Sequence, residues 1–553
     1  MRISFLKITS CFALFVMGFI FNPGSLSMAQ MCVKPLKRSL LLSGSFGEIR
    51  SSHLHSGIDI KTGGVQGLPV LAVQYGIVSR VVVSPVGYGL ALYVDHPDGT
   101  TSVYGHLQRF APQVAKVVHE MQYQNQSYRI DENILDRQIY FDQGEIIGYS
   151  GNSGSSAGPH LHFEIRNTET EHTLNPLSYL SIYDKRAPLL QSLLLYRITD
   201  DGEVRLLSSN ALNASETGAF PFKCYTVPAG NVAIGLHMTD RMNNSSNALG
   251  VYRIDVTAGQ DTIYHLSMDS CSFDQTRLVN DLKDFDEFKR RRTVYRCFGN
   301  YQKEILAVSM RGNGSVYVPQ DSVVKLRVRV ADINGNSRIL NFALKGGEPH
   351  KEDADRACLR YGMPHDVAIK NWKVKLHERS LFSSVPDQVA VKEHASSSYG
   401  MLVLSEKEVP LNEKADLRLI GQFAAKTVIC ELSANGRKYP LPTEWSEQGL
   451  ACKIGSLSRY IISQDTIAPT LTYQGKTGTT YISFKTSDNL SGVYSYTGTV
   501  NGEWCIFAYD PRTGILKCRL DEYVFKSGIE NVVEMRVEDA VGNSKKMVVK
   551  VRK

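Results

Sequence analysis

The chain has 553 residues, a formal net charge of +7 and ten cysteines. This length is more than one hydrophobic core supports, so we expect three to four domains. The basic excess is mild and lacks long basic runs or interleaved aromatic and basic residues, which argues against a nucleic-acid partner; residues 289–292 are an isolated basic cluster.

Residues 1–29 have the features of a secretory signal peptide. Arg2 and Lys7 precede an apolar stretch, and Ser27-Met-Ala29 supplies small residues for cleavage before Gln30. The apolar stretch of about 14 residues is too short for a spanning helix. No later segment reaches that length, so we expect no transmembrane span. The sequence therefore predicts a periplasmic or secreted protein, cleaved after Ala29.

Two short patterns place polar side chains on the faces of predicted strands. In His160-Leu-His162, residues two apart point to the same face, so the two imidazoles can converge. The run Ile-Asp-Ile around Asp59 alternates in the same way and turns its carboxylate away from the core. Two imidazoles and one carboxylate make a three-ligand site with an open fourth position, which is typical of catalytic zinc.

Each pattern alone is weak, because a His-x-His arises often by chance among 14 histidines and a surface or core strand histidine is the alternative. The surrounding turns strengthen the prediction. Glycine and proline flank the patterns at residues 45–47, 67–70 and 148–159, where they can bring short strands to one spot.

These residues, with His106 in Tyr-Gly-His-Leu, resemble the M23 family of zinc metallopeptidases of the lysostaphin and LytM type. The resemblance covers about residues 40–180. The shared sequence motifs are Ser-Phe-Gly, His-x-Gly-x-Asp, Gly-x-Pro-Val, Gly-x-Val, Tyr-Gly-His-Leu, Gly-Glu-x-Ile-Gly-x-Ser-Gly and Gly-Pro-His-Leu-His-Phe-Glu. It implies that the zinc ligands are His55, Asp59 and His162, and that His106 and His160 are catalytic residues beside the metal-bound water. Which of these two is the base stays open.

The resemblance further implies an exported zinc metalloendopeptidase that hydrolyses peptide cross-links of peptidoglycan through a metal-activated water. Related exported peptidases of Bacteroidota are similar between residues 107 and 144, which suggests that phylum as the source. A Gram-negative wall favours the bond from D-Ala to diaminopimelate. The alternatives are a non-catalytic, metal-binding regulator or activator of another cell-wall hydrolase, and a structural or adhesive protein; the intact set of five residues argues against both.

Two neighbours of the predicted site have open roles. His53 can swing toward the metal or belong to a neighbouring loop, and Glu164 can orient a ligand or pack locally. For His106, the alternative is a core histidine behind Tyr104.

The segment between residues 107 and 144 is an insertion. Apolar residues at helical spacing predict a helix over 111–122, and residues 127–130 are predicted to form a short strand. The insertion follows His106 directly, so it is either a wall of the substrate groove or a surface elaboration.

The remainder is predicted to be β-rich. Tyr183-Asp-Lys-Arg-Ala-Pro188 and Gln464-Asp-Thr-Ile-Ala-Pro469 are similar linkers, each before alternating β sequence. The sequence thus predicts a mainly β fold: a peptidase domain of antiparallel β type at 30–182, an immunoglobulin-like region at 185–347, a β-rich module at 350–462 and an immunoglobulin-like domain at 465–553. Residues 281–292 are predicted to be a charged, helix-prone excursion.

A second repeat is Asp-x-x-Gly-Asn, which occurs at 332–336 and 539–543. It predicts a tight turn with a residue at positive φ. Calcium binding is the alternative, but the carboxylates at each turn are too few to favour it.

The C-terminal β domains are expected to bind a protein or glycan partner or to act as spacers, and to lean over the groove if the enzyme is latent. Cys430 with Cys452, and Cys505 with Cys518, are possible disulfides that the sequence leaves undecided.

Overall fold

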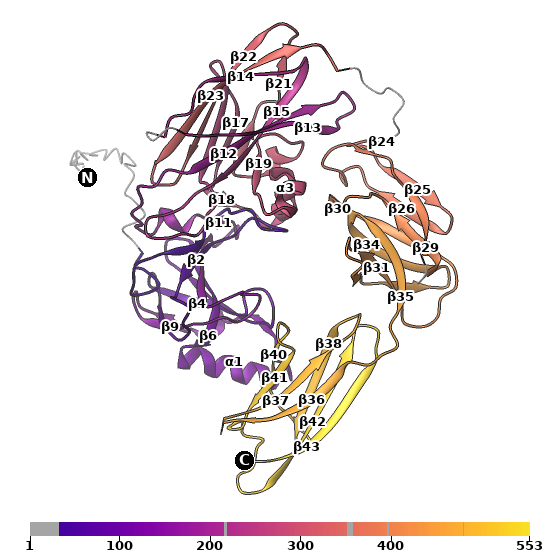
Figure 1. The fold of residues 1–553 in the computed structure, drawn as a ribbon. Helices are drawn as coiled ribbons and strands as arrows, with labels where there is room; N and C mark the ends of the chain where they lie inside the picture. Colours follow the sequence, from indigo (N-terminus) through magenta and orange to yellow (C-terminus); the bar gives the residue numbers. More distant parts are fainter. Residues whose placement is uncertain (1–31, 215–217, 351–357, 395–396, 479) are drawn as a thin grey trace, which may run out of the picture.

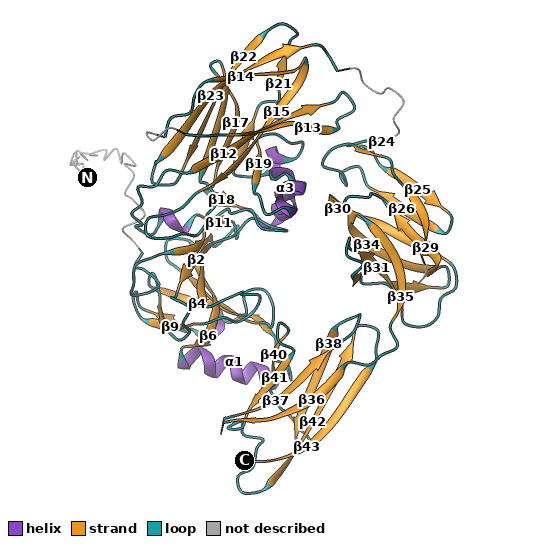
Figure 2. Cartoon of the chain, viewed as in Figure 1, coloured by secondary structure: helices purple, strands orange, loops and turns teal. Residues whose placement is uncertain are grey.

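The computed structural model describes residues 32–214, 218–350, 358–394, 397–478 and 480–553. The predicted signal peptide lies outside these residues. The described chain is mainly β, as the sequence predicted, with short helices confined to the N-terminal two thirds (Figure 2). None of the described helices has the length and apolar character needed to cross a membrane.

The N-terminal region forms a 12-stranded sheet with the central order β1-β2-β10-β6-β5-β4-β7. Its strands are β1 (Leu42–Gly44), β2 (Ile58–Lys61), β3 (Pro69–Leu71), β4 (Gly76–Val83), β5 (Leu90–Asp95), β6 (Thr100–Phe110), β7 (Ile130–Asn133), β8 (Tyr140–Phe141), β9 (Ile146–Ser150), β10 (His160–Asn167), β11 (Thr173–Leu174) and β18 (Ser270–Cys271). The last of these comes from the following region, so the sheet joins two parts of the chain. Helix α1 (Pro112–Gln124) begins at a proline and buries Val114 and Val118. Short 3-10 helices are η2 (Leu135–Arg137) and η3 (Pro176–Ser178).

The next region contains a five-stranded and a six-stranded sheet. The first holds β12 (Leu189–Ile198), β13 (Val204–Ala211), β15 (Gly230–Thr239), β19 (Val294–Arg296) and β21 (Val316–Val318). The second holds β14 (Lys223–Pro228), β16 (Arg253–Ala258), β17 (Asp261–Ser267), β20 (Val308–Met310), β22 (Val323–Ala331) and β23 (Ser337–Gly347). Between β18 and β19 the chain forms η4 (Phe273–Leu278), α2 (Val279–Leu282) and α3 (Phe285–Lys289), with η5 (Gln302–Glu304) before β20.

Two further pairs of sheets follow. The third region has β24 (Cys358–Leu359) paired with β27 (Val385–Pro386); a sheet of β25 (His365–Ile369), β26 (Trp372–Leu376), β30 (Val409–Ile420), β33 (Glu444–Ser446) and β34 (Gly449–Leu457); and a sheet of β28 (Ala390–His394), β29 (Ser397–Val403), β31 (Thr427–Leu432), β32 (Lys438–Pro440) and β35 (Arg459–Gln464). The last region has β36 (Thr470–Thr477), β37 (Tyr481–Ser487), β40 (Ala508–Asp510) and β41 (Ile515–Arg519) in one sheet, and β38 (Val493–Val500), β39 (Glu503–Trp504), β42 (Glu530–Asp539) and β43 (Ser544–Arg552) in the other.

The hydrophobic cores do not follow these regions one to one. One continuous core includes Leu36 of the N-terminal region, Leu344 of the second region and Phe382. The third and last regions each have a core of their own, centred on residues such as Trp372 and Phe484. The first two regions are therefore packed as a single body, to which the third region adds Phe382. The third and last regions have further cores of their own and meet at a small cluster around Cys430, against which Leu490 and Val541 pack.

The last region returns to the first, so that the chain closes on itself (Figure 1). Glu522 Oε2 lies 2.9 Å from His119 Nε2 and accepts a hydrogen bond from the Tyr123 hydroxyl at 2.8 Å. The Tyr123 ring also packs edge-on against Trp504 and beside Tyr523. These contacts hold α1 against the C-terminal sandwich.

Most predicted elements form close to where the sequence places them. The helix expected at 111–122 is α1, and the helix-prone segment at 281–292 contains α3 and part of α2. The strand expected at 127–130 begins only at Ile130, because Ser127 Oγ accepts a hydrogen bond from the Arg129 amide and makes a turn there. All cysteines of the described residues are free thiols, although the sulfur atoms of Cys505 and Cys518 lie 3.2 Å apart.

Candidate metal centre and catalytic site

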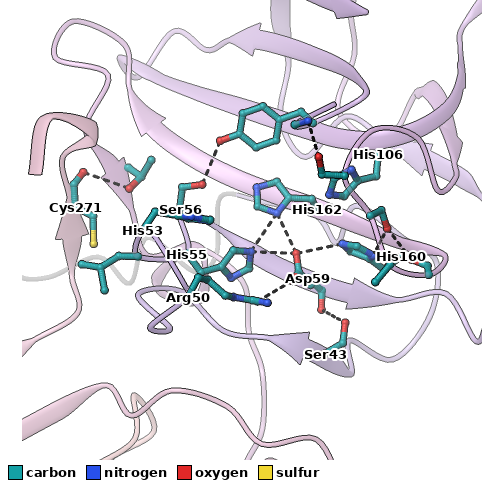
Figure 3. Close-up of a pocket in the computed structure, with 18 of the residues that line it drawn as sticks. Ser43, Arg50, His53, His55, Ser56, Asp59, His106, His160, His162 and Cys271 are labelled. Atoms are coloured by element: carbon teal, nitrogen blue, oxygen red, sulfur yellow. Dashed lines mark hydrogen bonds and ion pairs between the residues drawn. The ribbon is translucent and has the colours of Figure 1, made fainter. Parts of the chain in front are cut away.

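The pairing of β2 with β10 brings the predicted metal ligands together. In this antiparallel pair His162 lies opposite Asp59, and on its other side β10 places His162 opposite Gly105 of β6. Ile58 and Ile60 are fully buried behind the sheet, as the alternating pattern predicted. His55 precedes β2, and Figure 3 shows the three side chains pointing toward one another.

Three ligand atoms form a nearly regular triangle. His55 Nε2 and His162 Nδ1 are 3.2 Å apart, and they lie 3.1 Å and 2.9 Å from Asp59 Oδ1. Tetrahedral ligands at Zn–N and Zn–O distances sit about 3.3 Å from each other. All three residues are buried. The donor set and its spacing therefore fit a zinc ion with a fourth position left open.

The second nitrogen of each imidazole is held in place. His55 Nδ1 donates to the carbonyl of Ser45 at 2.8 Å, and His162 Nε2 lies 2.8 Å from Glu164 Oε1. Metal-ligating histidines ordinarily donate their other N–H to a carbonyl or carboxylate, which fixes the tautomer and the ring orientation. Glu164 is thus placed to orient a ligand, the first of its two predicted roles.

Glu164 is fully buried within a network of its own. Its carboxylate accepts hydrogen bonds from Ser56 Oγ at 2.5 Å, Tyr88 Oη at 2.6 Å and Arg166 Nε at 2.7 Å. Burial alone would favour the protonated acid, but the charge of Arg166 and the hydrogen bond with His162 hold the pKa of Glu164 well below its usual range. Glu164 is therefore an anion behind His162.

Asp59 is also ionised despite burial. Burial alone would raise the pKa of Asp59, but its electrostatic interaction with His55 and its hydrogen bonds with His160, His162 and His55 hold that pKa well below its usual range. Its outer oxygen, Oδ2, accepts a hydrogen bond from Arg50 at 3.0 Å. In turn, although burial opposes charge on His162, its bonds to Asp59 and Glu164 raise its pKa to about 9. In the metal-free protein His162 therefore carries a proton at neutral pH.

His106 lies beside the triangle in a strained backbone conformation. Its φ is +57°, which is uncommon for a residue other than glycine and marks many functional positions. The Nδ1–H donates to the Ser153 carbonyl at 2.9 Å, which leaves Nε2 free. Burial and the nearby charges of His162 and His160 lower the pKa of His106 to about 3. The ring is therefore neutral at physiological pH.

His160 is held in a similar manner from the other side. Its Nδ1 lies 2.8 Å from the Gly158 carbonyl and 3.1 Å from Ser156 Oγ, and its Nε2 is 3.3 Å from Asp59 Oδ1. The rings of His106 and His160 have centroids 4.8 Å apart and meet edge to face. Both imidazoles thus border the triangle, with Nε2 of His106 free and Nε2 of His160 beside Asp59 Oδ1. His53 is not one of the three clustered ligands; it lies on the preceding loop, where Ser52 Oγ is 3.3 Å from its Nδ1.

The site opens into a cavity of about 870 Å³. One wall comes from the first region, including Lys61 and Tyr88. The opposite wall comes from residues 271–305 of the second region, which extend the predicted excursion at 281–292 on both sides and are called the excursion from here on; it includes Phe273, Thr276 and Ile305. The excursion is anchored by the buried Lys283, whose Nζ donates to the carbonyls of Arg50 and Ser51. Two regions therefore enclose the space above the metal triangle.

The insertion helix does not form this wall. None of the described residues that line the cavity belongs to α1 or to the last region. The groove-wall alternative for the insertion at 107–144 is therefore wrong for this cavity. The expectation that C-terminal β domains lean over the groove holds for the second region, which forms the opposite wall, and not for the last region. The last region instead contacts the loop of residues 151–159, here called the His160 loop: Arg512 donates to the carbonyls of Asn152, at 3.0 Å, and Ser156.

Sequence reasoning missed several residues of the site. Arg166 follows Glu164 and His162 at the period of two along β10, and this spacing could have revealed it. Tyr88 and Arg50 come from a glycine-framed turn and from a loop, where no periodicity applies.

The comparison with family models bears on this region. The model of peptidase family M23 matches residues 53–123 and 113–176, which include His55, Asp59, His106, His160 and His162. The DD-carboxypeptidase/endopeptidase Mpg of Neisseria meningitidis serogroup B is 32% identical over 113 residues, 20% of this chain and 20% of that protein. An uncharacterized metalloprotease of Haemophilus influenzae is 28% identical over 150 residues, 26% of each chain.

Among solved structures, the catalytic domain of the antimicrobial peptidase lysostaphin from Staphylococcus simulans is 23% identical. That match covers 24% of this chain and 86% of the other, with a TM-score of 0.18. The chain spans about a fifth of the length of the Neisseria relative.

Proposed function

We propose, from the M23 peptidase domain that the chain carries, that the protein is an exported zinc metalloendopeptidase that hydrolyses peptide cross-links of peptidoglycan. The observation that carries this proposal is the triangle of His55, Asp59 and His162, with two further imidazoles at its border. We assign residues 30–182 to the peptidase domain, and 185–347, 350–462 and 465–553 to three β domains.

His55 Nε2, His162 Nδ1 and Asp59 Oδ1 are the atoms that would hold the metal. A bound Zn²⁺ supplies Lewis-acid chemistry, since it lowers the pKa of a coordinated water and polarises a carbonyl. The protein's part is to keep the donors deprotonated and oriented. Glu164 and the Ser45 carbonyl do so from behind, and Arg50 holds the outer oxygen of Asp59 away from the triangle.

His106 and His160 share the proton transfers. The His106 ring donates Nδ1–H to a backbone carbonyl, so it presents a proton-accepting Nε2 to the substrate side. A neutral His106 accepts the proton of the attacking water and returns it to the leaving amine. His160 can stabilise the charge that develops on the carbonyl oxygen through an N–H at Nε2, the nitrogen that lies 3.3 Å from Asp59 Oδ1.

The cavity suits a short peptide segment. Its volume of about 870 Å³ is in the range that small ligands and peptide segments occupy. Lys61 supplies a positive charge for a carboxylate of the stem peptide, and Phe273 supplies an apolar surface on the opposite wall.

For the bond itself, we propose the cross-link from D-Ala to diaminopimelate. The Neisseria relative's name, DD-carboxypeptidase/endopeptidase, supports a bond between two D-centres. The predicted signal peptide supports action in the periplasm or outside the cell.

The test is a mass profile of muropeptides after purified diaminopimelate-type peptidoglycan is incubated with the zinc-loaded chain from Gln30. We expect chelator-sensitive conversion of cross-linked dimers to monomers. The mass of the products identifies the bond.

The matched control is His162→Ala, which removes one of three ligands and should lose both zinc and turnover. An unchanged profile from wild-type protein shown to retain zinc would refute the peptidase proposal. It would favour the regulator of another hydrolase instead.

A further inference from the structure

Two clusters of three aspartates lie outside the metal triangle, in separate parts of the chain. The first aspartate cluster is Asp184, Asp240 and Asp332, and the second is Asp465, Asp488 and Asp539. Within each cluster one carboxylate oxygen of every residue lies within 4.8 Å of the others. Five of the six residues are buried, and Asp488 is half-buried.

The two clusters are built from the same three parts of the chain. One aspartate comes from the linker before a β region, at Asp184 and at Asp465. One follows a strand, Asp240 after β15 and Asp488 after β37. The third begins the repeated Asp-x-x-Gly-Asn turn, and the expected positive φ of that turn is confirmed at its glycines, with values of +88° and +84°.

The supporting hydrogen bonds repeat as well. Asn336 Nδ2 donates to Asp332 Oδ2 at 2.6 Å and to the Asp184 carbonyl at 3.1 Å. In the second cluster the amide at position 543 makes the same pair of bonds, to Asp539 Oδ2 at 2.7 Å and to the Asp465 carbonyl at 3.0 Å. Each turn is therefore tied to its linker, and both clusters have one architecture.

One carboxylate oxygen in each cluster is left without a partner. These are Oδ1 of Asp240 and Oδ1 of Asp488, the equivalent strand-end residues. Asp240 is only 8% exposed, so its unpartnered oxygen is held away from water at an energetic cost. Burial and the charges of Asp332 and Asp184 raise the pKa of Asp240 to about 7. A cation among these oxygens would remove both the unpaired acceptor and the repulsion.

The first cluster has room for such a cation. Its three aspartates line a cavity of about 40 Å³, more than one water needs. The donors are all oxygen, which suits Ca²⁺, Mg²⁺ or Mn²⁺ and not a soft metal. Carboxylates from three separate segments form an irregular cage, and Ca²⁺ accepts such geometry whereas Mg²⁺ demands a near-ideal octahedron with most of its waters.

We propose that the two aspartate clusters are Ca²⁺ sites, each of which fastens an interdomain linker to the β sandwich that follows it. Asp184 and Asp465 supply the linker oxygens, and the strand-end and turn aspartates supply the rest. The first site also bears on the peptidase domain, because Ser45 and Phe46 line the same cavity and the Ser45 carbonyl holds His55. The second site would hold its linker against the C-terminal sandwich, which contacts α1 through Glu522.

The experiment is a calorimetric titration of CaCl₂ into the zinc-loaded chain from Gln30, freed of other divalent ions. We expect two Ca²⁺ per chain, with dissociation constants of about 10⁻⁴ to 10⁻³ M, as in extracellular modules. Asp240→Asn and Asp488→Asn should each leave one site and the double variant none. MgCl₂ should bind at least about tenfold more weakly.

A second measurement separates a ligand from a structural role. In calcium-free buffer, Asp240→Asn should unfold at the same temperature as the wild type or higher, because it removes a buried charge repelled by two others. Calcium should then raise the Tm of the wild type more than that of the variant. If Asp240 had a purely structural role, the Asp240→Asn variant would have a lower Tm than the wild type without calcium, and calcium would raise the Tm of both proteins equally.

Asp366→Asn is the matched control, since Asp366 is exposed on β25 and outside both clusters; it should keep two sites. The absence of saturable Ca²⁺ binding by the folded wild type, or a stoichiometry of two in both cluster variants, overturns the proposal. If Asp240→Asn does not fold, the Asp488→Asn stoichiometry decides.

Discussion

His162 Nε2 lies 2.8 Å from Glu164 Oε1, two residues further along the same strand and on the same face. Because this bond fixes which nitrogen of His162 faces Asp59, the metal triangle depends on a residue that does not belong to it. We therefore expect Glu164→Gln, which keeps the shape and removes the charge, to weaken zinc binding about 10- to 100-fold.

Competition with a chelating indicator measures this loss. Glu120→Gln on the exposed face of α1 is the control and should bind zinc like the wild type. Equal affinities in the Glu164 and Glu120 variants would show that the hydrogen bond contributes nothing to the site.

Replacing His106 should separate catalysis from metal binding. Asparagine tolerates the positive φ of this position, so His106→Asn is preferable to alanine. We expect full zinc content and a fall in turnover of about 10²- to 10⁴-fold, the usual contribution of a general acid or base. A normal rate would remove His106 from the mechanism.

Metal-free protein should lose stability as the pH rises from 7 to 9.5. The pKa of His162 is raised from 6.5 to about 9 by Asp59 and Glu164, so its proton stabilises the fold fully below pH 6.5 and is lost through pH 9. The size is ~3 kcal/mol if the whole shift counts. The measurement is the change in the free energy of unfolding between pH 7 and pH 9.5, in the metal-free wild type and in the metal-free His162→Gln variant.

That variant should show a correspondingly smaller change, since its side chain does not titrate. For the same reason, zinc binding to the wild type at pH 7 should release about one proton from His162, measured by calorimetry in buffers of different ionisation enthalpy. Identical pH dependence in the two proteins would contradict this account.

Phe273 should contribute to substrate binding more than to the chemical step. It belongs to the excursion that forms the far wall of the cavity, and its ring is half-exposed there beneath the Arg166 guanidinium. We expect Phe273→Ala to raise KM several-fold with little change in kcat, because it removes contacts made equally in ground and transition states. Tyr317→Ala is the control, because Tyr317 is exposed on a strand outside the cavity. A fall in kcat with an unchanged KM in the Phe273 variant would contradict a role for Phe273 in the wall of the cavity.

Contact with the last domain should support the His160 loop. Arg512 binds the carbonyls of Asn152 and Ser156, and the same loop holds His106 and His160 through the Ser153 and Gly158 carbonyls. We expect Arg512→Ala to reduce kcat about tenfold without loss of zinc, since small displacements of catalytic groups are costly. A rise in turnover would instead indicate that the contact inhibits the enzyme. Arg536→Ala, on an exposed part of the same domain, is the control.

Local patterns predicted the parts of the site that lie within single strands. The alternation in His-Leu-His and Ile-Asp-Ile correctly placed His160, His162 and Asp59 on the same face of two paired strands. The sequence could not show which distant segment covers the site. The far wall begins at Cys271, about a hundred residues beyond β10, and depends on how β18 joins the first sheet.

The aspartate clusters were not predicted from the sequence for the same reason, because their members come from distant segments. Each turn holds a single usable carboxylate, and the calcium alternative was set aside on that ground. The second and third carboxylates come from a linker and a strand end that only the sandwich topology brings to the turn. The sequence did contain two signals, a repeated linker and a repeated turn. Only together do they indicate that a linker aspartate and a turn aspartate belong to one cluster.

The continuous core that runs from Leu36 to Phe382 has a consequence for how such proteins diversify. A catalytic unit that shares its interior with a neighbour cannot be exchanged alone by gene recombination, because a new partner would leave apolar surface uncovered. The peptidase and its first sandwich should be inherited as a pair. The third and fourth units have larger interiors of their own and share less apolar surface with their neighbours, Phe382 and the small cluster around Cys430, so their replacement would uncover less.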